Sequence, residues 1–177
     1  MPTYDPTLDQ LDFDNTQIIP EYAGFWLRFA AYFIDGIVST IATYALLFAV
    51  VFSIKGLNIE TLETDIEGDP IIATLILAIY LGVPWLYYAL MESSEKQATV
   101  GKIALGLKVV DMYGDRITFA RATGRYFAKI ISAITILIGY IMAGFTDRKQ
   151  ALHDMIASTL VVKKSPEYGQ YKSRHSD

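Results

Sequence analysis

The chain has 177 residues, of which 53% are hydrophobic, and a mean hydropathy of +0.31, which is more apolar than a soluble domain of this length needs. Its formal net charge of −4 gives no basic footprint for nucleic acid, and its lack of cysteine excludes disulfides, thiol nucleophiles and cysteine-ligated metals. A membrane protein, with the lipid bilayer as its main partner and no nucleic acid, is therefore the first hypothesis.

The amino-terminal segment is acidic. Residues 1–25 carry five acids and no base, whereas a cleavable signal peptide begins with basic residues. We therefore expect the apolar segment that follows to remain in the mature protein. Low hydrophobicity and high charge predict a mobile tail over residues 1–21, followed by a membrane domain over residues 22–163 and a polar carboxyl-terminal tail over residues 164–177.

Three apolar segments lie within the membrane domain, at residues 29–54, 71–91 and 126–145. Each is close to the ~20 residues that a helix needs to cross ~30 Å of hydrocarbon. The connection 55–70 has one base and five acids, whereas the connection 92–125 has six bases. Because cytoplasmic connections are enriched in Lys and Arg, we expect 55–70 to lie outside, and 92–125 and the amino terminus to lie inside.

The third apolar segment conflicts with a simple series of crossings. Three full crossings would place residues 147–177 outside, yet this end of the chain also carries six bases. We interpret the segment as a re-entrant hairpin that turns near Gly139 and packs against the spanning helices, since protein or water must satisfy re-entrant backbone. A third full span remains the alternative. The predicted fold class is membrane α-helical, with two transmembrane helices, this segment, amphipathic helices and a small cytoplasmic β-sheet.

The sheet is predicted from β-rich sequence outside the apolar segments. The stretch LKVVDMYGDRITF has two such arms around a Tyr-Gly-Asp turn, and TLVV near the carboxyl end is a further short strand. Since an isolated hairpin is only marginally stable, we expect a three-stranded sheet of residues 107–112, 116–119 and 159–163. A short amphipathic helix, capped by Thr99 and ended by Gly106, precedes it.

Two charged residues stand at the start of the first apolar segment. Arg28 and Asp35 are seven residues apart, so on a helix they share a face about 10 Å apart along the axis. Both side chains lean toward the amino end, which predicts that Arg28 reaches the headgroups as an interfacial anchor. The short side chain of Asp35 cannot follow and needs a partner on another element.

Basic residues form one stripe on the helix that leads into the third segment, because Arg121, Arg125 and Lys129 recur every four residues. Two interpretations have about equal weight. The stripe is either an interfacial site for lipid phosphates, or a source of partners in which Arg125 or Lys129 pairs with Asp35 or with an acid of the last helix.

The last predicted helix opens in the stretch TDRKQALHDMIAST. Asp147 with Gln150 three residues later fits a capping box, and Asp154 shares a face with Asp147. We favour an ordinary polar or buried imidazole for His153 over a proton-handling one. The two histidines, His153 and His175, lack the spacing of a zinc site, so we expect no metal. Without an identifiable catalytic arrangement, the sequence indicates neither an enzyme nor a cofactor.

Four blocks of the sequence together carry a family resemblance: AGFWLRFAAYFIDG, ESSEKQATVGKIALGLKVVD, RITFARATGRYFAKIISA and DRKQALHDMIASTLVV. They resemble the RDD family of small bacterial membrane proteins, named for one arginine and two aspartates, over about residues 22–162. The resemblance implies a multi-pass protein of the bacterial inner membrane. It also implies that Arg28 is the family arginine, that Asp35 is the first aspartate, and that Asp154 is the second, with Asp147 as the less favoured match.

Two classes of function remain open. In a transport function, Asp35 and Asp154, biased by Arg28 and the basic stripe, would bind a cation, a proton or another small ligand. In an accessory function, the same charges would only hold the fold together while the protein scaffolds or assists a partner. Two spans and a hairpin enclose little of a pathway, so a homo-oligomer or another membrane protein is an expected partner.

Overall fold

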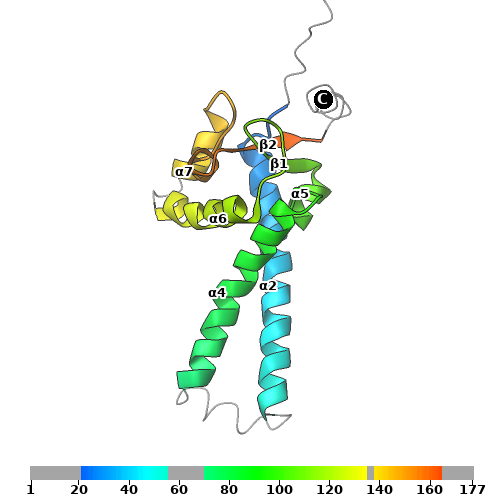
Figure 1. Cartoon of the computed structure of the whole chain (residues 1–177), viewed down its shortest axis with the longest axis vertical. Coiled ribbons are helices and arrows are strands. Elements are labelled where there is room, and N and C mark those ends of the chain that lie inside the picture. Colours follow the sequence, from blue (N-terminus) through cyan, green and yellow to red (C-terminus); the bar gives the residue numbers. More distant parts are fainter. Residues whose placement is uncertain (1–20, 56–69, 135–137, 165–177) are drawn as a thin grey trace, which may run out of the picture.

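The computed structural model describes residues 21–55, 70–134 and 138–164. The predicted tails and the connection between the first two apolar segments lie largely outside these residues. In chain order the elements are α2 (Phe25–Lys55), α4 (Pro70–Ser93), α5 (Val100–Ala104), β1 (Leu107–Asp111), α6 (Phe119–Ile134), α7 (Ile138–Ile141), the 3₁₀ helix η1 (Met142–Gly144), α8 (Leu152–Ile156) and β2 (Thr159–Lys163). Figure 1 shows α2 and α4 as a long pair that extends from a cap formed by the other elements.

The long pair has the properties of membrane-spanning helices. Among the described residues, Phe25–Ser53 and Pro70–Ser93 are the two helical stretches that are long and apolar enough to cross a membrane. Their large side chains point outward, and Phe33 and Phe48 are 64% and 70% exposed. Water would make so much exposed apolar surface unfavourable, whereas lipid accommodates it. The predicted pair of spans is therefore confirmed as two helices of suitable length and composition.

One face of α2 is buried by its neighbours, and it carries the small and polar residues Ala31, Asp35, Ser39 and Thr43. The hydroxyl of Thr43 donates to the Ser39 carbonyl at 2.8 Å, so this buried hydroxyl finds its hydrogen-bond partner within α2. Small residues let helices approach closely in a membrane. This face is where α4 and α5 pack against α2.

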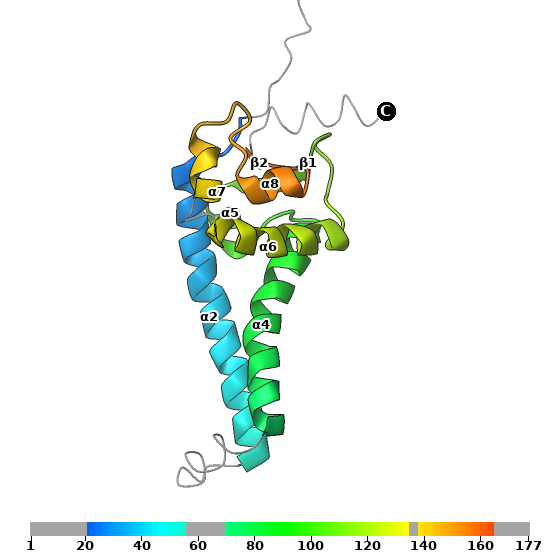
Figure 2. The same cartoon turned by 90° about the vertical axis from the view of Figure 1, so that its left-hand side faces the viewer.

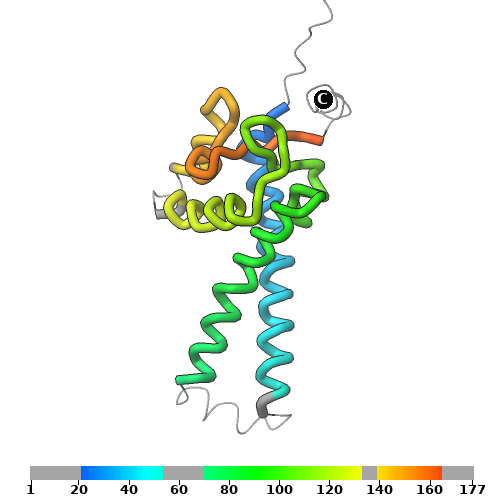
Figure 3. The backbone as a smooth tube through the Cα atoms, in the orientation of Figure 1, coloured from blue at the N-terminus to red at the C-terminus, as the bar shows by residue number. Residues whose placement is uncertain are grey.

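The small sheet has two strands, not three. β1 and β2 are antiparallel, with Val109 opposite Val161, so the predicted pairing of these segments is confirmed. The predicted strand 116–119 is wrong: residues 116–118 form no strand and Phe119 begins α6, before which the Thr118 carbonyl accepts the Ala122 amide at 2.9 Å. The free side of β2 is used by the amino-terminal end of the described chain, where the Ala23 amide donates to the Val161 carbonyl at 2.9 Å. Figure 3 shows the amino-terminal end of the described chain next to β2, on the side of the cap away from the long pair.

The third apolar segment does not form one continuous helix. α6 ends at Ile134 and α7 begins at Ile138, and α6 lies crosswise to the long pair in both views (Figures 1 and 2). α6 and α7 meet at Gly139, where an added Cβ would lie 3.0 Å from the Cα of Ser132. Such a close approach requires glycine. The hairpin near this residue and the third span both stay predictions.

The last helix begins later than predicted. α8 starts at Leu152, and the Asp154 carboxylate accepts the Ala151 amide at 3.1 Å across its first turn. The predicted capping box at Asp147 is wrong, because the backbone amide of Gln150 donates to the hydroxyl of Thr146 at 2.7 Å. Asp147 lies exposed in the turn before the helix and shares no helical face with Asp154.

Candidate functional site

The first of two buried polar groups surrounds Asp35 on α2, which is 1% exposed. Its Oδ1 accepts the Tyr87 hydroxyl at 2.8 Å and the Gly101 amide at 2.7 Å, and its Oδ2 accepts the Thr99 hydroxyl at 2.5 Å. These donors come from α4 and from the start of α5, and all of them are uncharged. The predicted partner on another element exists, but it is not a basic side chain, so the alternative in which Arg125 or Lys129 pairs with Asp35 is wrong.

The backbone of α5 reaches Asp35 because residue 101 is a glycine. A Cβ there would lie 2.2 Å from the Ala31 carbonyl oxygen and 3.0 Å from the Asp35 carboxyl carbon. Thr99 occupies the cap position of α5, as predicted, yet its hydroxyl bonds Asp35 and makes no cap bond. Asp35 thus fixes the segment 99–101 against α2 through two short hydrogen bonds, from the Thr99 hydroxyl and the Gly101 amide.

The second group surrounds Asp154, which is fully buried at the start of α8. Its Oδ1 accepts the Arg125 Nε at 2.9 Å, and its Oδ2 forms an ion pair with the Arg28 Nη1. The prediction of Arg28 as an interfacial anchor is therefore wrong. The cap covers the beginning of α2, so that Arg28 faces protein, and its Nε donates to the Ala23 carbonyl at 2.8 Å.

Arg125 joins this group to a third carboxylate. Its Nη1 donates to the Glu92 Oε2 at 2.7 Å, and Lys102 pairs with the other oxygen of Glu92. The Lys129 ammonium lies 3.8 Å from the Glu92 Oε1 and 3.8 Å from the centre of the Tyr88 ring. We call Arg28, Glu92, Lys102, Arg125, Lys129 and Asp154 the charge cluster. It connects α2, α4, α5, α6 and α8 around one point.

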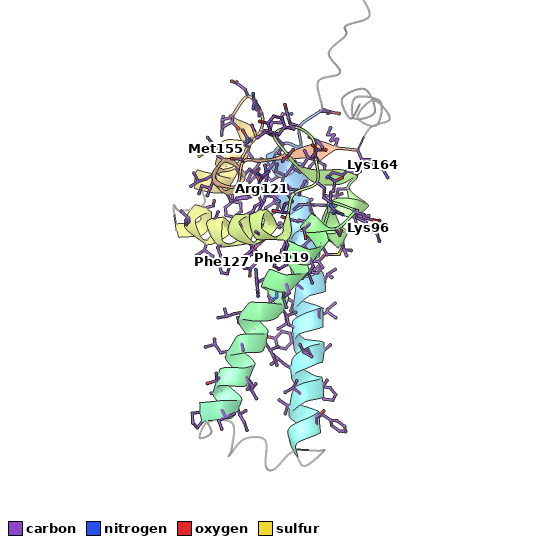
Figure 4. The ribbon with its side chains drawn as sticks, viewed as in Figure 1. Lys96, Phe119, Arg121, Phe127, Met155 and Lys164 are labelled. Atoms are coloured by element: carbon purple, nitrogen blue, oxygen red, sulfur yellow. The ribbon has the colours of Figure 1, made fainter. Side chains whose placement is uncertain are left out.

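The predicted basic stripe divides between two surroundings. Arg125 pairs with an acid of the last helix, which is one of the two interpretations of the sequence, and Lys129 reaches the same cluster. Arg121 lies on the outer side of α6, where its Nη1 is 3.5 Å from the Asp111 carboxylate. Figure 4 shows Arg121 and Phe127 on opposite sides of this helix. The stripe is thus two buried cations and one half-exposed cation.

Sequence reasoning missed Glu92 and Lys102, as well as the three donors to Asp35. Glu92 follows Tyr88 by four residues, so both lie on one face of α4, and an acid at the end of an apolar helix was the available signal. Lys102 follows Gly101 in the short helix α5 and gives no comparable signal. Its burial follows from the docking of α5 against α2, which is a tertiary effect.

Burial and neighbouring charges set the protonation states in the cap. Burial opposes ionisation of Asp154, but the charges of Arg125 and Arg28 outweigh it and hold the pKa of Asp154 well below its usual range. Burial lowers the pKa of Lys129 to about 7 and the pKa of His153 to about 3. The His153 ring is therefore neutral near pH 7, with its Nδ1 3.4 Å from the Ser132 hydroxyl.

The known relatives of the chain can now be compared with this geometry. The RDD family model matches residues 22–158, which include both polar groups. The chain belongs to the RDD family. The uncharacterized protein YxaI of Bacillus subtilis is 40% identical over 148 residues, covering 80% of this chain and 97% of that protein. The uncharacterized membrane protein YteJ of the same organism is 36% identical over 147 residues, covering 80% of each chain. No solved structure matches.

Each of the two polar groups contains residues that the resemblance implies are the family's arginine and aspartates. Arg28, which the resemblance implies is the family arginine, pairs with Asp154, whereas Asp147 is exposed; the choice of Asp154 as the second aspartate stays a prediction. Asp35, assigned as the first aspartate, is bonded instead to neutral donors of α4 and α5. Within the described ranges, no group of three histidine or acidic side chains is arranged to hold a metal ion.

Proposed function

We propose that this RDD-family membrane protein is a non-enzymatic accessory protein of the bacterial inner membrane, whose buried charges hold a cytoplasmic cap on two spanning helices. The observation that carries this proposal is the saturation of its buried carboxylates. Each oxygen of Asp35, Glu92 and Asp154 accepts a hydrogen bond or an ion pair from the protein.

A cation carrier needs carboxylate or carbonyl oxygens that can surround the ion. Na⁺ and similar hard cations bind several oxygens at once, and each buried carboxylate here would first have to lose a protein donor. Arg28, Lys102, Arg125 and Lys129 also lie in the same region and would repel an entering cation. Both points favour a structural role for the charges over transport of cations.

The orientation follows from the distribution of bases and the shape of α6. The cap contains the basic connection 92–125, which favours the cytoplasm. Phe119 and Phe127 lie on the side of α6 that is turned toward the membrane-spanning part of α2 and α4 (Figure 4). Their exposed fractions are 41% and 51%. A crosswise helix with such a face suits the membrane interface. The exposed apolar faces of α2 and α4 would then serve to contact a second copy or another membrane protein.

Flux measurements in proteoliposomes test this proposal. Vesicles that contain the wild-type protein should show no more Na⁺, K⁺ or H⁺ flux than protein-free vesicles. Asp35→Asn and the exposed control Glu95→Gln should give the same result. A wild-type flux that Asp35→Asn abolishes, in folded protein, while Glu95→Gln retains it would overturn the accessory function in favour of cation transport.

A further inference from the structure

The charge cluster holds more cations than carboxylates. Its basic members are Arg28, Lys102, Arg125 and Lys129, and its acidic members are Glu92 and Asp154. A third buried carboxylate, that of Asp35, is held by neutral donors in a group of its own. Uncompensated positive charge is costly in a buried region, because the surrounding protein screens it poorly. The cluster therefore favours the loss of a proton from one of its cations.

Lys129 is the lysine of this cluster with the weaker contact to a carboxylate. Arginine keeps its proton in proteins, so the choice of cation lies between the two lysines. Burial lowers the pKa of both, but the Lys102 ammonium donates a hydrogen bond to the Glu92 Oε1 at 2.5 Å. The Lys129 nitrogen lies 3.8 Å from the same oxygen, which is beyond hydrogen-bonding distance. Lys129 therefore loses less than Lys102 when it becomes a neutral amine.

Two cavities meet at Lys129. They have volumes of about 300 and 250 Å³, and both are lined by Lys129, Tyr32, Tyr88 and Tyr140. The surface of the larger cavity is mostly apolar, which disfavours an ammonium ion. The Lys129 side chain is 13% exposed, so protons can reach it through these cavities. The position thus combines an apolar surrounding with access to solvent protons.

The charges around Lys129 come from every helix packed around it. The titratable and charged side chains that face it or line its cavities are Arg28, Tyr32 and Asp35 of α2, Tyr88 and Glu92 of α4, Lys102 of α5, Arg125 and Tyr126 of α6, Tyr140 of α7, and His153 and Asp154 of α8. Burial opposes the ammonium form of Lys129 most strongly, and the charges of Lys102 and Arg125 oppose it further. Glu92 and Asp154 favour that form without compensating, so the pKa of Lys129 falls to about 7.

We propose that Lys129 is a reversible proton-binding site, which loosens the cap when it takes up a proton from solvent. The proton adds to the lone pair of the Nζ atom, and no other bond changes. The resulting ammonium repels Lys102 and Arg125, which already share the carboxylate of Glu92. α6 carries Lys129 and packs between α4 and α8 (Figure 2), so the added charge weakens the contact of α6 with α4. The site needs no flux of protons across the membrane and does not depend on the proposed accessory function.

Two substitutions fix the charge at this position, because Lys129→Met is neutral at every pH and Lys129→Arg stays cationic. Unfolding is followed by SDS titration at pH 7.5 and 9, above the range in which an ordinary histidine titrates. An unfolded lysine keeps its proton in this range, while folded Lys129 releases its proton, so the folded state gains stability as the pH rises. The unfolding equilibrium constant of the wild type should fall by about twentyfold between the two pH values.

Both variants should lack this fall, whereas the control Arg121→Gln should retain it, because Arg121 lies on the outer side of α6 and pairs with Asp111. NMR of the detergent-solubilised wild-type chain, with carbon-13 at the lysine Cε atoms, follows the protonation directly. The signal that is missing from either variant belongs to residue 129. Its titration midpoint should lie between pH ~6 and ~8.

Three results would overturn the proposal. A midpoint of Lys129 outside this range would show that it stays charged or stays neutral. A midpoint within the range at Lys102 in its place would show that the other lysine gives up the proton. A fall of the wild-type size in Lys129→Met would show that the pH dependence arises elsewhere. Circular dichroism checks the fold of each variant, and a misfolded Lys129→Met would leave Lys129→Arg to supply both the signal assignment and the comparison.

Discussion

The carboxylates of Asp35 and Asp154 are both buried and hydrogen-bonded, but the donors around them differ in charge. Asp35 accepts two hydroxyls and one backbone amide, whereas Asp154 accepts two arginines and one amide. A group held by neutral donors keeps most of its bonds when its own charge is removed. When a carboxylate held by buried cations loses its charge, those cations are left without a counter-charge. The two aspartates should therefore respond differently to the same substitution.

The largest effect is expected at Asp154. Asp154→Asn leaves the buried guanidiniums of Arg28 and Arg125 without their shared counter-charge, which costs about 3–5 kcal/mol for a buried pair that loses one partner. The measurement is the free energy of unfolding by SDS titration in detergent micelles. Asp147→Asn, at an exposed turn, is the control and should change it by less than about 0.5 kcal/mol. Similar losses in both variants would contradict the central place of Asp154.

Gly101→Ala tests the close approach of α5 to α2. The new Cβ would lie 2.2 Å from the Ala31 carbonyl, so α5 must shift away from Asp35, at a cost of about 1–3 kcal/mol by analogy with overpacked cores. Gly124→Ala is the matched control within α6, where a Cβ meets nothing within 4 Å and alanine favours the helix. If Gly101→Ala were as stable as Gly124→Ala in the same titration, the docking of α5 would be wrong.

Acid should weaken the cap through His153. Burial lowers its pKa to about 3 in the folded protein, while the unfolded chain keeps a value near 6.5. Between these two values the unfolded state binds a proton that the folded state does not, so stability falls as the pH drops through this window. The loss at pH 5 relative to pH 7 is about 2 kcal/mol. SDS titration at both pH values should show this loss in wild type and its absence in His153→Gln.

Asp35→Asn should have the smallest effect on stability. The amide oxygen can still accept the Gly101 amide, and the amide nitrogen can donate to the hydroxyl of Thr99, so about 1 kcal/mol is lost. The measurement is the free energy of unfolding of Asp35→Asn and Asp154→Asn in one SDS titration series. An Asp35→Asn loss equal to or larger than that of Asp154→Asn would show that the charge of Asp35 has a partner that the geometry does not reveal.

How much of this could be predicted from sequence differs between the two halves of the protein. The long pair follows from length and hydropathy alone, and the pairing of β1 with β2 follows from two short β-rich stretches. The strand expected at 116–119 does not form, because Phe119 already belongs to α6 and the hydroxyl of Thr118 accepts the Arg121 amide at 3.3 Å in its first turn. Helix boundaries around short elements depend on such single hydrogen bonds, which composition does not reveal.

The polar groups were harder to predict because their partners are brought together by tertiary packing. The spacing of Arg125 on its helix was enough to suggest a pairing with an acid of the last helix. The role of Arg28 was not predictable, because nothing in its own segment shows that the cap covers the start of α2. The donors to Asp35 include the backbone amide of Gly101, and a backbone donor gives no side-chain signal in the sequence.

The pairing of Arg28 with Asp154, and not with Asp35, is the central claim, and double-mutant cycles test it most directly. Unfolding free energies are measured for Arg28→Gln, Asp154→Asn and Asp35→Asn, and for the two double variants that contain Arg28→Gln. We predict a coupling of about 1–3 kcal/mol between Arg28 and Asp154, as for residues in one buried network, and a much smaller one between Arg28 and Asp35. A larger coupling of Arg28 to Asp35 than to Asp154 would contradict the arrangement described.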